Sequence, residues 1–249
     1  MAGHSHWAGI KHKKALIDNK RGKLFSKLAK NIISAARQGG GNPEDNLKLR
    51  YAIDKAKSVS MPRDNIERAI KTGTGELDSD KQFEEIVYEG YGAGGVAIML
   101  DILTDNRNRT APEIRKLFEK HNGQLGATGC VAWMFDQRGL ITIKAEGVDE
   151  DQLMEDALEA GAENMELSGD LFEITCQPSD FEDVSKALEA AGYAFEMAEV
   201  TFLPQNYVTV EPGSAKPVMN LMEALDDHDD VQNVYANADF PEDAEAVAE

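Results

Sequence analysis

Apolar residues recur at helical spacing through the first 75 positions. Between residues 22 and 38 they return every three or four positions, which places them on one face of a helix. This helix is expected to end at the three glycines 39–41, because glycine readily terminates helices. The positions that define its apolar face are Leu24, Leu28, Ile32 and Ala35.

Two shorter helices are expected to follow. Asn42 is the predicted N-cap of the first, with Pro43 in the first helical position. The second is predicted to begin near Pro62 and to end at Gly73. Their apolar faces are formed by Leu49, Ala52, Ile53 and Ala56, and by Ile66, Ala69 and Ile70. Three helices with narrow apolar faces predict a small helical domain over residues 1–76.

The pattern changes to strands after residue 83. Two apolar runs, 84–91 and 95–104, flank the sequence GAGG, which indicates a β-hairpin. A helix is predicted from about Thr110 to His121, followed by a glycine-rich loop over 122–129 and a strand over 130–135.

Residues 139–203 alternate in the order β-α-β-β-α-β, which is the ferredoxin-like arrangement. One more helix (217–230) and one more strand (231–238) follow, and neither can bury an apolar face alone. Both are therefore expected to return to the unit formed before residue 137. The sequence predicts an α+β protein in which a helical N-terminal domain precedes two α+β domains, the ferredoxin-like one inserted into the other. The predicted ranges are 1–76, 77–136 plus 205–240, 137–204, and an acidic tail at 241–249.

Charge divides the chain unevenly. The formal net charge is −19, yet residues 1–75 contain 16 Lys or Arg and six Asp or Glu, which leaves ten basic and 39 acidic residues for the remainder. Such polarity favours a molecule whose basic end faces a polyanion while its acidic part is repelled from it. The alternative is a lysine-rich helical face that is simply solvated.

The densest basic stretch lies between residues 11 and 30. Lysine and arginine neutralise phosphates and release counterions, which gives binding without base readout. Trp7, just ahead, is positioned either to stack on a base or to pack on the helical domain. The candidate nucleic-acid contacts in this stretch are Lys11, His12, Lys13, Lys14, Lys20, Arg21, Lys23, Lys27 and Lys30.

A second candidate contact is the sequence TDNRNRTAPE. Arg107 and Arg109 lie just ahead of a predicted helix, and guanidinium groups beside a helix N-terminus suit a phosphate. The alternative interpretation is a polar loop held by its own hydrogen bonds.

Other motifs do not lead to a catalytic site or a cofactor. The GYGAGG sequence at 90–95 is followed by a strand, whereas a dinucleotide site needs a helix there. The DDHDD sequence at 226–230 lacks calcium-loop spacing and is interpreted as a solvated helix end. Cys130 and Cys176 are expected to be free thiols. We therefore expect no enzyme activity, no metal, no cofactor and no small-molecule substrate.

The chain shows no apolar run of the length that crosses a membrane and no secretory or transit segment. We accordingly expect a cytoplasmic protein without a membrane partner.

With these stretches in view, the sequence resembles the YebC/PmpR family of probable transcriptional regulators over nearly its whole length. The resemblance is carried by MAGHSHWAGIKHKKA, KRGKLFSKL, ARQGGGNPEDN, MPRDNIERAIKTG, YEGYGAGG, LTDNRNRTAPEIR and NGQLGATGCVAWMF, in that order.

The resemblance implies a three-domain, cytoplasmic, non-enzymatic regulator of gene expression. It implies DNA binding and transcription regulation. The alternative it offers is a ribosome-associated translation factor that binds ribosomal RNA and relieves stalling at proline runs, as relatives that include a mitochondrial translational activator of cytochrome oxidase suggest. A glycine-loop tip at 123–129 that reaches into a crowded site would fit the second function, whereas the alternative for that tip is an ordinary loop.

Overall fold

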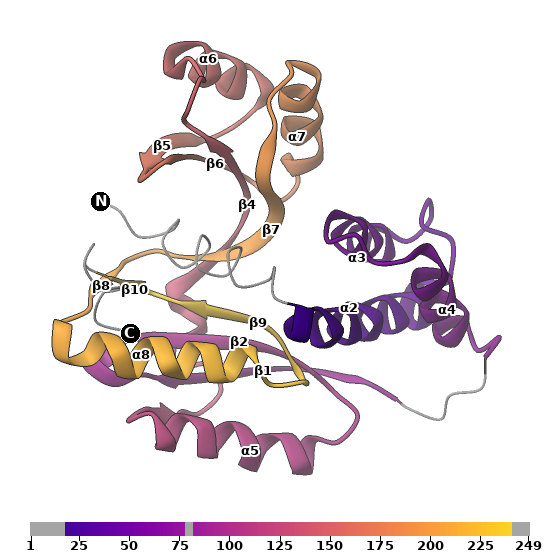
Figure 1. Cartoon of the computed structure of the whole chain (residues 1–249), viewed down its shortest axis with the longest axis vertical. Coiled ribbons are helices and arrows are strands. Elements are labelled where there is room, and N and C mark those ends of the chain that lie inside the picture. The colour runs from indigo at the N-terminus through magenta and orange to yellow at the C-terminus, as the bar shows by residue number, and fades with distance from the viewer. Residues whose placement is uncertain (1–17, 78–81, 241–249) are drawn as a thin grey trace.

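The chain folds as an α+β protein in which a helical domain precedes two antiparallel sheets, as the sequence predicts. The computed structural model describes residues 18–77 and 82–240. Figure 1 shows the helical domain beside the sheet formed by β1, β2 and β9, with the second sheet and its helices α6 and α7 on the opposite side of that sheet from α5.

The helical domain consists of α2 (Asp18–Gly39), α3 (Leu47–Ser58) and α4 (Arg63–Thr74). Both shorter helices pack on α2 and bury a shared apolar core that includes Ile32, Leu49 and Ile66. The closest approach is at Gly73, where a Cβ atom would lie 2.6 Å from the Cβ of Ala36. This position therefore accepts only glycine.

The start of α3 differs from the prediction. Residues 43–45 form a turn, and the N-cap is Asn46, whose Oδ1 accepts from the Leu49 N–H at 3.1 Å. The amide of the same side chain donates to the carbonyl oxygens of Ala35 and Gly40, both at 2.8 Å. Asn42 was the wrong choice because Asn46 also satisfies the carbonyl groups at the end of α2, a contact that local sequence does not reveal.

The second unit contains a four-stranded antiparallel sheet in the order β3-β1-β2-β9. Alternate residues of β2 point toward α5 and α8, which cover one face of this sheet. The core there includes Ile98, Leu100, Phe118 and Leu221. The elements are β1 (Glu84–Tyr91), β2 (Ala97–Thr104), α5 (Arg107–Lys120), β3 (Gln124–Leu125), α8 (Pro212–Asp226) and β9 (Val231–Ala236). A short parallel pair, β8 (Val208–Thr209) with β10 (Ala238–Asp239), was not predicted.

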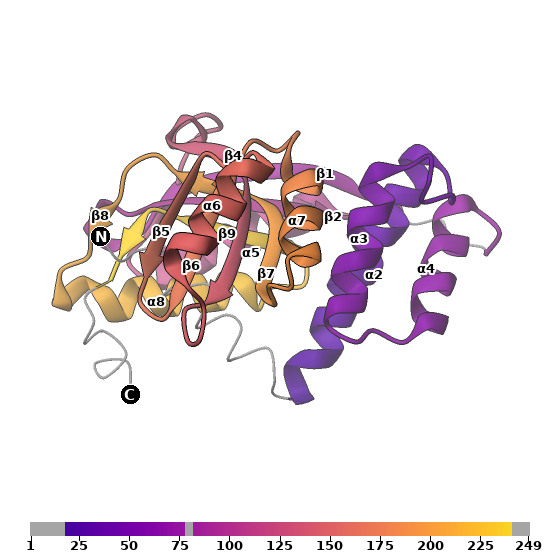
Figure 2. The same ribbon diagram turned by 90° about the horizontal axis from the view of Figure 1, so that it is seen from above.

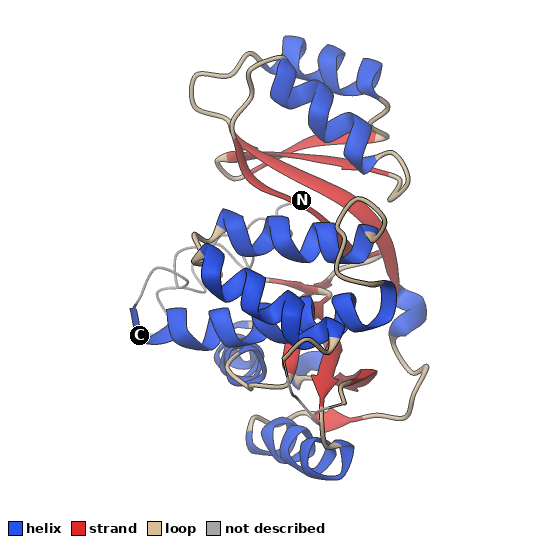
Figure 3. Cartoon of the chain, turned by 90° about the vertical axis from the view of Figure 1, so that its right-hand side faces the viewer, coloured by secondary structure: helices blue, strands red, loops and turns tan. Residues whose placement is uncertain are grey.

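The third unit is ferredoxin-like, with strand order β5-β6-β4-β7. Figure 3 shows its two helices on the face of the sheet that points away from the rest of the molecule. The elements are β4 (Phe135–Lys144), α6 (Glu150–Ala160), β5 (Asn164–Ser168), β6 (Leu171–Cys176), α7 (Phe181–Ala190) and β7 (Phe195–Pro204).

The chain enters and leaves this unit through neighbouring strands. Phe135 at the start of β4 pairs in register with Pro204 at the end of β7. The same end of this ladder packs on the face of the first sheet that α5 and α8 leave open, where Phe202 and Tyr235 form an edge-to-face pair at 5.3 Å. Adjacent entry and exit strands explain how one domain is inserted into another.

The predicted strand at 130–135 is wrong. Residues Ala132–Met134 form a short 3-10 turn (η2), and β4 begins only at Phe135. The apolar run is long enough for a strand, but backbone N–H groups in this segment are hydrogen-bonded to a buried carboxylate, as described below.

Candidate nucleic-acid interface

The predicted basic contacts are divided between the described residues and the rest of the chain. Lys11, His12, Lys13 and Lys14 lie outside the described residues, as does the side chain of Lys20 within α2. The four that follow, Arg21, Lys23, Lys27 and Lys30, belong to the first half of α2, and Arg107 and Arg109 belong to the first turn of α5.

The lysines of α2 form one face because they are four and three positions apart. This face lies against the loop that joins α8 to β9. Lys23 Nζ donates to the carbonyl oxygen of Asp227 at 3.3 Å, and Lys27 Nζ donates to that of Asp226. Lys30 Nζ donates to the carbonyl oxygen of Asp229 in the same loop at 2.9 Å. Three of the predicted phosphate contacts, Lys23, Lys27 and Lys30, thus have partners within the chain.

Asp230 is the centre of this contact. Its Oδ1 lies 2.9 Å from Lys30 Nζ, and its Oδ2 lies 2.6 Å from Arg109 Nη2. The hydroxyl groups of Thr104 and Thr110 donate to the same Oδ2 at 3.1 and 2.8 Å. Asp230 is only 2% exposed, so the prediction of a solvated end for the DDHDD sequence is wrong at this residue.

Burial and hydrogen bonding act in opposite directions on the Asp230 carboxyl. Burial by itself would raise its pKa, but hydrogen bonds from Lys30, Arg109 and Thr110, together with the charge of Lys30, hold the pKa well below its usual range. Asp230 therefore stays ionised at neutral pH. It pairs with Lys30 and Arg109, two of the residues that the sequence predicted to contact phosphate.

The two arginines of α5 have different surroundings. Asn106 caps the helix through its Oδ1, which accepts from the Arg109 N–H at 3.2 Å, so α5 begins at Arg107 rather than near Thr110. Arg109 also pairs with Asp105 at 3.1 Å, whereas the more exposed Arg107 lies 3.6 Å from Glu84. Arg109 is held by Asp230 and Asp105, which fits the interpretation of a polar loop held by its own hydrogen bonds. Arg107 is the more exposed of the two arginines, and a contact between Arg107 and a phosphate stays a prediction.

A cavity of about 600 Å³ opens between α2, α5 and the α8–β9 loop. Three cations contribute to its wall, but five carboxylates do as well, so its charge does not favour a phosphate. The residues that line it are Lys23, Lys30, Phe83, Asp105, Arg109, Glu113, Asp227, His228, Asp229 and Asp230.

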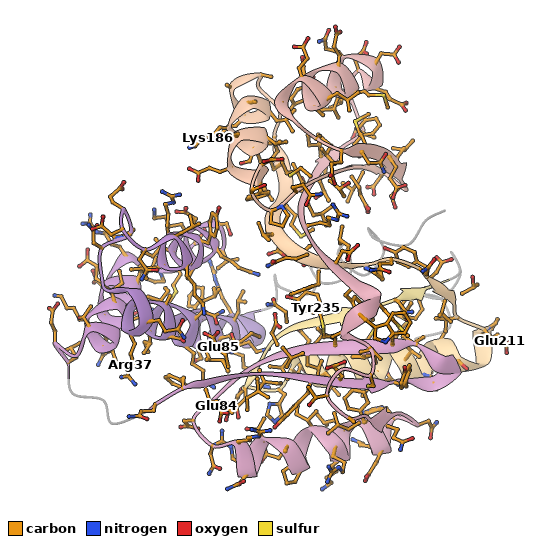
Figure 4. All side chains as sticks on the ribbon, turned by 180° about the vertical axis from the view of Figure 1, so that it is seen from behind. Arg37, Glu84, Glu85, Lys186, Glu211 and Tyr235 are labelled. Carbon is orange, nitrogen blue, oxygen red and sulfur yellow. The ribbon has the colours of Figure 1, made fainter. Side chains whose placement is uncertain are left out.

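Further ion pairs join the basic helical domain to the acidic units. Lys48 lies 2.6 Å from Glu85, which Figure 4 shows at the start of β1 next to the helical domain. Arg50 lies 2.8 Å from Glu182 of α7. Lys55 lies 2.8 Å from Glu199 of β7. Part of the positive charge of the helical domain therefore pairs with carboxylates of the other two units and helps to hold the domains together.

Basic side chains also remain at the surface of the helical domain. Arg21 is exposed near the start of α2, with its guanidinium 5.8 Å from the centre of the Phe25 ring. Arg37 is exposed in the last turn of α2 and, in Figure 4, lies on the side away from α7. Arg68 and Lys71 are exposed on α4. These residues present positive charge to solvent away from the contact with Asp230.

The sequence did not predict the role of Glu89, a buried residue of β1. The carboxylate of Glu89, on β1, is buried and accepts three backbone N–H bonds, from Gly129 at 2.6 Å and from Val131 and Ala132 at 2.7 Å. Burial alone would raise its pKa, yet these three donors hold the pKa below its usual range. No motif around Glu89 in the sequence signals this role.

Glu89 fixes the glycine-rich loop that the sequence singled out at 123–129. The tip of this loop, residues 126–129, is exposed, and Trp133 just beyond it is 65% exposed. The indole N–H of Trp133 donates to the Cys130 carbonyl oxygen at 3.2 Å, which orients the ring. The result is a preformed loop that presents an aromatic ring to solvent.

The remaining motifs are structural within the described residues. Gly94 and Gly95 have φ values of 69° and 79° in the connection between β1 and β2, so the GYGAGG glycines serve a hairpin. Cys130 and Cys176 are free thiols. Across 18–77 and 82–240 no helix combines the length and the apolar character that crossing a membrane requires.

Comparison with known proteins identifies the relatives of this chain. Residues 5–76 match the model of the TACO1/YebC protein N-terminal domain, and residues 83–238 match the model of the TACO1/YebC second and third domain. A protein of Natranaerobius thermophilus named "Probable transcriptional regulatory protein" is 60% identical, covering 96% of this chain and 97% of its own length. One of Dictyoglomus thermophilum with the same name is 56% identical, covering 97% of each.

A solved structure has the same fold. The crystal structure of a conserved hypothetical protein from Aquifex aeolicus superimposes with a TM-score of 0.84 at 49% identity, covering 96% of this chain and 98% of that one.

Proposed function

The chain belongs to the TACO1/YebC family, and we propose that it is a non-enzymatic regulator of gene expression that acts by binding nucleic acid. Relatives with more than half of their residues identical are named probable transcriptional regulatory proteins, which supports a regulatory role and promoter DNA as the target. The proposal includes DNA binding itself.

The observation that carries the proposal is the basic surface of the helical domain. Arg21, Arg37, Arg68 and Lys71 are exposed there, and the first 75 residues contain ten more basic than acidic residues. The remainder of the chain carries 39 acidic and ten basic residues and is repelled by phosphate. A polyanion therefore approaches from the helical end.

This surface suits backbone contact better than base readout. Phosphate contacts position a protein on nucleic acid, whereas base edges are read by side chains that enter a groove. On α4, one of the two arginines, Arg63, pairs with Glu67 at 2.7 Å. We therefore expect strong salt dependence and modest sequence preference.

A second target, ribosomal RNA, is favoured by one specific observation. The loop that Glu89 fixes presents Trp133 at 65% exposure, and an exposed aromatic ring stacks on unpaired bases, which are common in RNA and absent from a regular duplex. Under this alternative the protein is a translation factor on the ribosome.

Anisotropy titrations of the full chain against labelled duplex DNA and a ribosomal-RNA fragment test the proposal. Arg21→Glu/Arg68→Glu/Lys71→Glu is expected to weaken binding at least tenfold, and the wild type with about five phosphate contacts should show a log–log salt slope of about −3.5 to −4.5. The matched control, Lys116→Glu/Lys144→Glu/Lys186→Glu, changes three exposed cations of the acidic units and should bind normally.

Equal binding by the two triple variants, or no salt dependence, would overturn the proposal. In-cell crosslinking followed by sequencing of the bound nucleic acid then separates the targets, since promoter fragments support transcription and ribosomal RNA supports translation. Trp133→Ala is expected to weaken binding to the ribosomal-RNA fragment alone if the second target is correct.

A further inference from the structure

The ferredoxin-like domain is strongly acidic and has an open sheet edge. Residues 137–204 contain 17 Asp or Glu and three Lys or Arg. Strand β5 is the outermost strand on one side of its sheet, and β6 is the strand with which it pairs. Its other edge is not paired with any strand of the described residues. An unpaired edge presents backbone N–H and C=O groups that can accept another strand.

Three exposed apolar side chains lie next to this edge: Met154, Leu158 and Leu167, which are 37%, 54% and 51% exposed. Leu167 pairs in register with Phe172, a core residue on the face that the helices cover, so Leu167 shares that face. It is therefore exposed on the side of β5 where α6 lies.

The orientation of α6 places the other two residues toward β5. Leu153 and Ala157 are fully buried against the sheet, and Asp156 accepts a hydrogen bond from the Tyr193 hydroxyl at 2.6 Å, on the side of α7. Met154 and Leu158 are one turn apart on the opposite flank of the helix. Figure 2 shows the same arrangement, with α6 over the β5 side of the sheet and α7 over the β7 side.

Carboxylates surround this apolar group. On α6, Asp151, Glu155 and Glu159 are exposed, and the helix contains no basic residue. On the other face of the sheet, Glu166 of β5 lies opposite Glu173 of β6. Glu173 is 2% exposed, and its Oε1 has no hydrogen-bond partner among the described residues. We call the β5 edge with Met154, Leu158 and Leu167 the β5 edge surface.

Charge decides which partner fits. A second copy of this domain would bring a further 17 carboxylates to the surface, and nucleic acid would be repelled in the same way. We propose that the β5 edge surface binds an extended, lysine- and arginine-rich segment of a partner protein, which adds to β5 as a further strand.

The two faces of β5 specify the pattern of that segment. Side chains of an added strand alternate between faces. Those on the α6 side meet Met154, Leu158 and Leu167 and should be apolar, whereas those on the opposite side meet Glu166 and should be basic. An alternation such as Val-Lys-Val-Lys satisfies both faces. This inference does not depend on nucleic-acid binding.

The test uses the full chain and a fluorescein-labelled twelve-residue peptide that alternates valine and lysine. A peptide that alternates valine and glutamate is the charge control. We expect the lysine peptide to bind and the glutamate peptide not to bind. Hydrogen–deuterium exchange should show protection of the amides of Asn164–Ser168 when the lysine peptide is bound.

The variant Leu158→Lys/Leu167→Lys is expected to weaken peptide binding at least tenfold, and Met154→Lys is a second, independent variant. Leu47→Lys is the matched control, since Leu47 is also 51% exposed but lies on α3. Because all four residues are exposed, circular dichroism and thermal unfolding should match the wild type. Anisotropy with duplex DNA should be unchanged in the Met154 variant and in the Leu158/Leu167 double variant, which separates this proposal from the proposed function.

Several results would overturn the inference. These are failure of the lysine peptide to bind, equal affinity of the wild type and the double variant, or unchanged exchange at β5. Sedimentation that shows a dimer in the wild type and a monomer in the double variant would assign the surface to self-association instead.

Discussion

Lys30 Nζ and Asp230 Oδ1 lie 2.9 Å apart, although the two residues are separated by 200 positions in the sequence. Arg109 Nη2 lies 2.6 Å from the other oxygen of the same carboxylate. One buried aspartate thus joins the helical domain, the first turn of α5 and the α8–β9 loop.

Replacing Asp230 tests this junction. Asp230→Asn leaves two cations without their counter-charge, and we expect the free energy of unfolding to fall by about 3 kcal/mol, at the low end for a broken buried pair because Lys30 and Arg109 are partly exposed. Urea unfolding at pH 7 measures it. Asp229→Asn, an exposed neighbour, is the control. A loss below 0.5 kcal/mol for Asp230→Asn, roughly the size of an ordinary surface substitution, would contradict the junction.

The same junction predicts an acid dependence. Because the pKa of Asp230 is held below its ordinary value of 3.8, the stability it contributes is fully present above that pH and is lost as pH falls toward the lower, folded-state pKa. The difference in unfolding free energy between wild type and Asp230→Asn should therefore shrink below about pH 4.

Glu89 should control the order of the glycine-rich loop. Glu89→Gln removes the charge and turns one acceptor into a donor that faces backbone N–H groups, and hydrogen bonds to a charged group contribute about 1.5–3 kcal/mol each. We expect amide exchange of Gly129, Val131 and Ala132 to accelerate at least about tenfold. Glu84→Gln, on the same strand but exposed, should leave these amides unchanged.

Glu173 should make the protein less stable at higher pH. Burial, with a smaller effect of Glu166, raises its pKa from 4.5 to about 7. Between these values the unfolded chain ionises while the folded protein keeps its proton, so stability falls as pH rises and levels off above pH 7, by about 3 kcal/mol in total.

Urea unfolding of Glu173→Gln from pH 4 to 8 measures this effect. In this variant the fall in unfolding free energy between pH 4 and 8 should be mostly absent. Glu196→Gln, at an exposed position of β7, should show the same fall as the wild type. A wild-type stability that rises steadily from pH 5 to pH 7, unaltered in Glu173→Gln, would rule out the assignment.

The two thiols should react at different rates. Burial, together with the charges of Asp180 and Glu163, raises the pKa of Cys176 to about 11, and Cys176 is 1% exposed. Burial and Glu89 raise the pKa of the partly buried Cys130. Since the thiolate is the reactive form, dithionitrobenzoate at pH 8 should label Cys130 first and Cys176 only on unfolding.

Single variants identify each phase of that reaction. Cys130→Ser should remove the faster phase and Cys176→Ser the slower one, and both thiols should react alike in denaturant. Regulatory activity that survives in Cys130→Ser supports the proposal that the protein is not an enzyme, and loss of activity in that variant would count against it.

The sequence by itself determined the elements whose patterns are local. The run at 84–91 beside the GAGG turn predicted β1 to the residue, because hairpin turns have a local sequence signal. The β-α-β-β-α-β order of 139–203 predicted the ferredoxin-like sheet, because hydrophobic periodicity reports which face of each element is buried. It also located the basic end of the chain, since charge is a property of composition.

Only the tertiary structure decided which of those charges meet one another. Asn46 replaced Asn42 as a cap because its amide also bonds to the carbonyl groups at the end of α2. Residues 131–134 do not extend the strand, because the N–H groups of Val131 and Ala132 are bonded to Glu89. Lys30 and Arg109 looked like phosphate contacts until the fold brought Asp230 between them. A charged residue in a sequence is able to bind an opposite charge. The fold decides which partner it binds, because the partner comes from a distant segment that no local pattern connects to it. The interaction is strengthened where burial lowers the local dielectric constant.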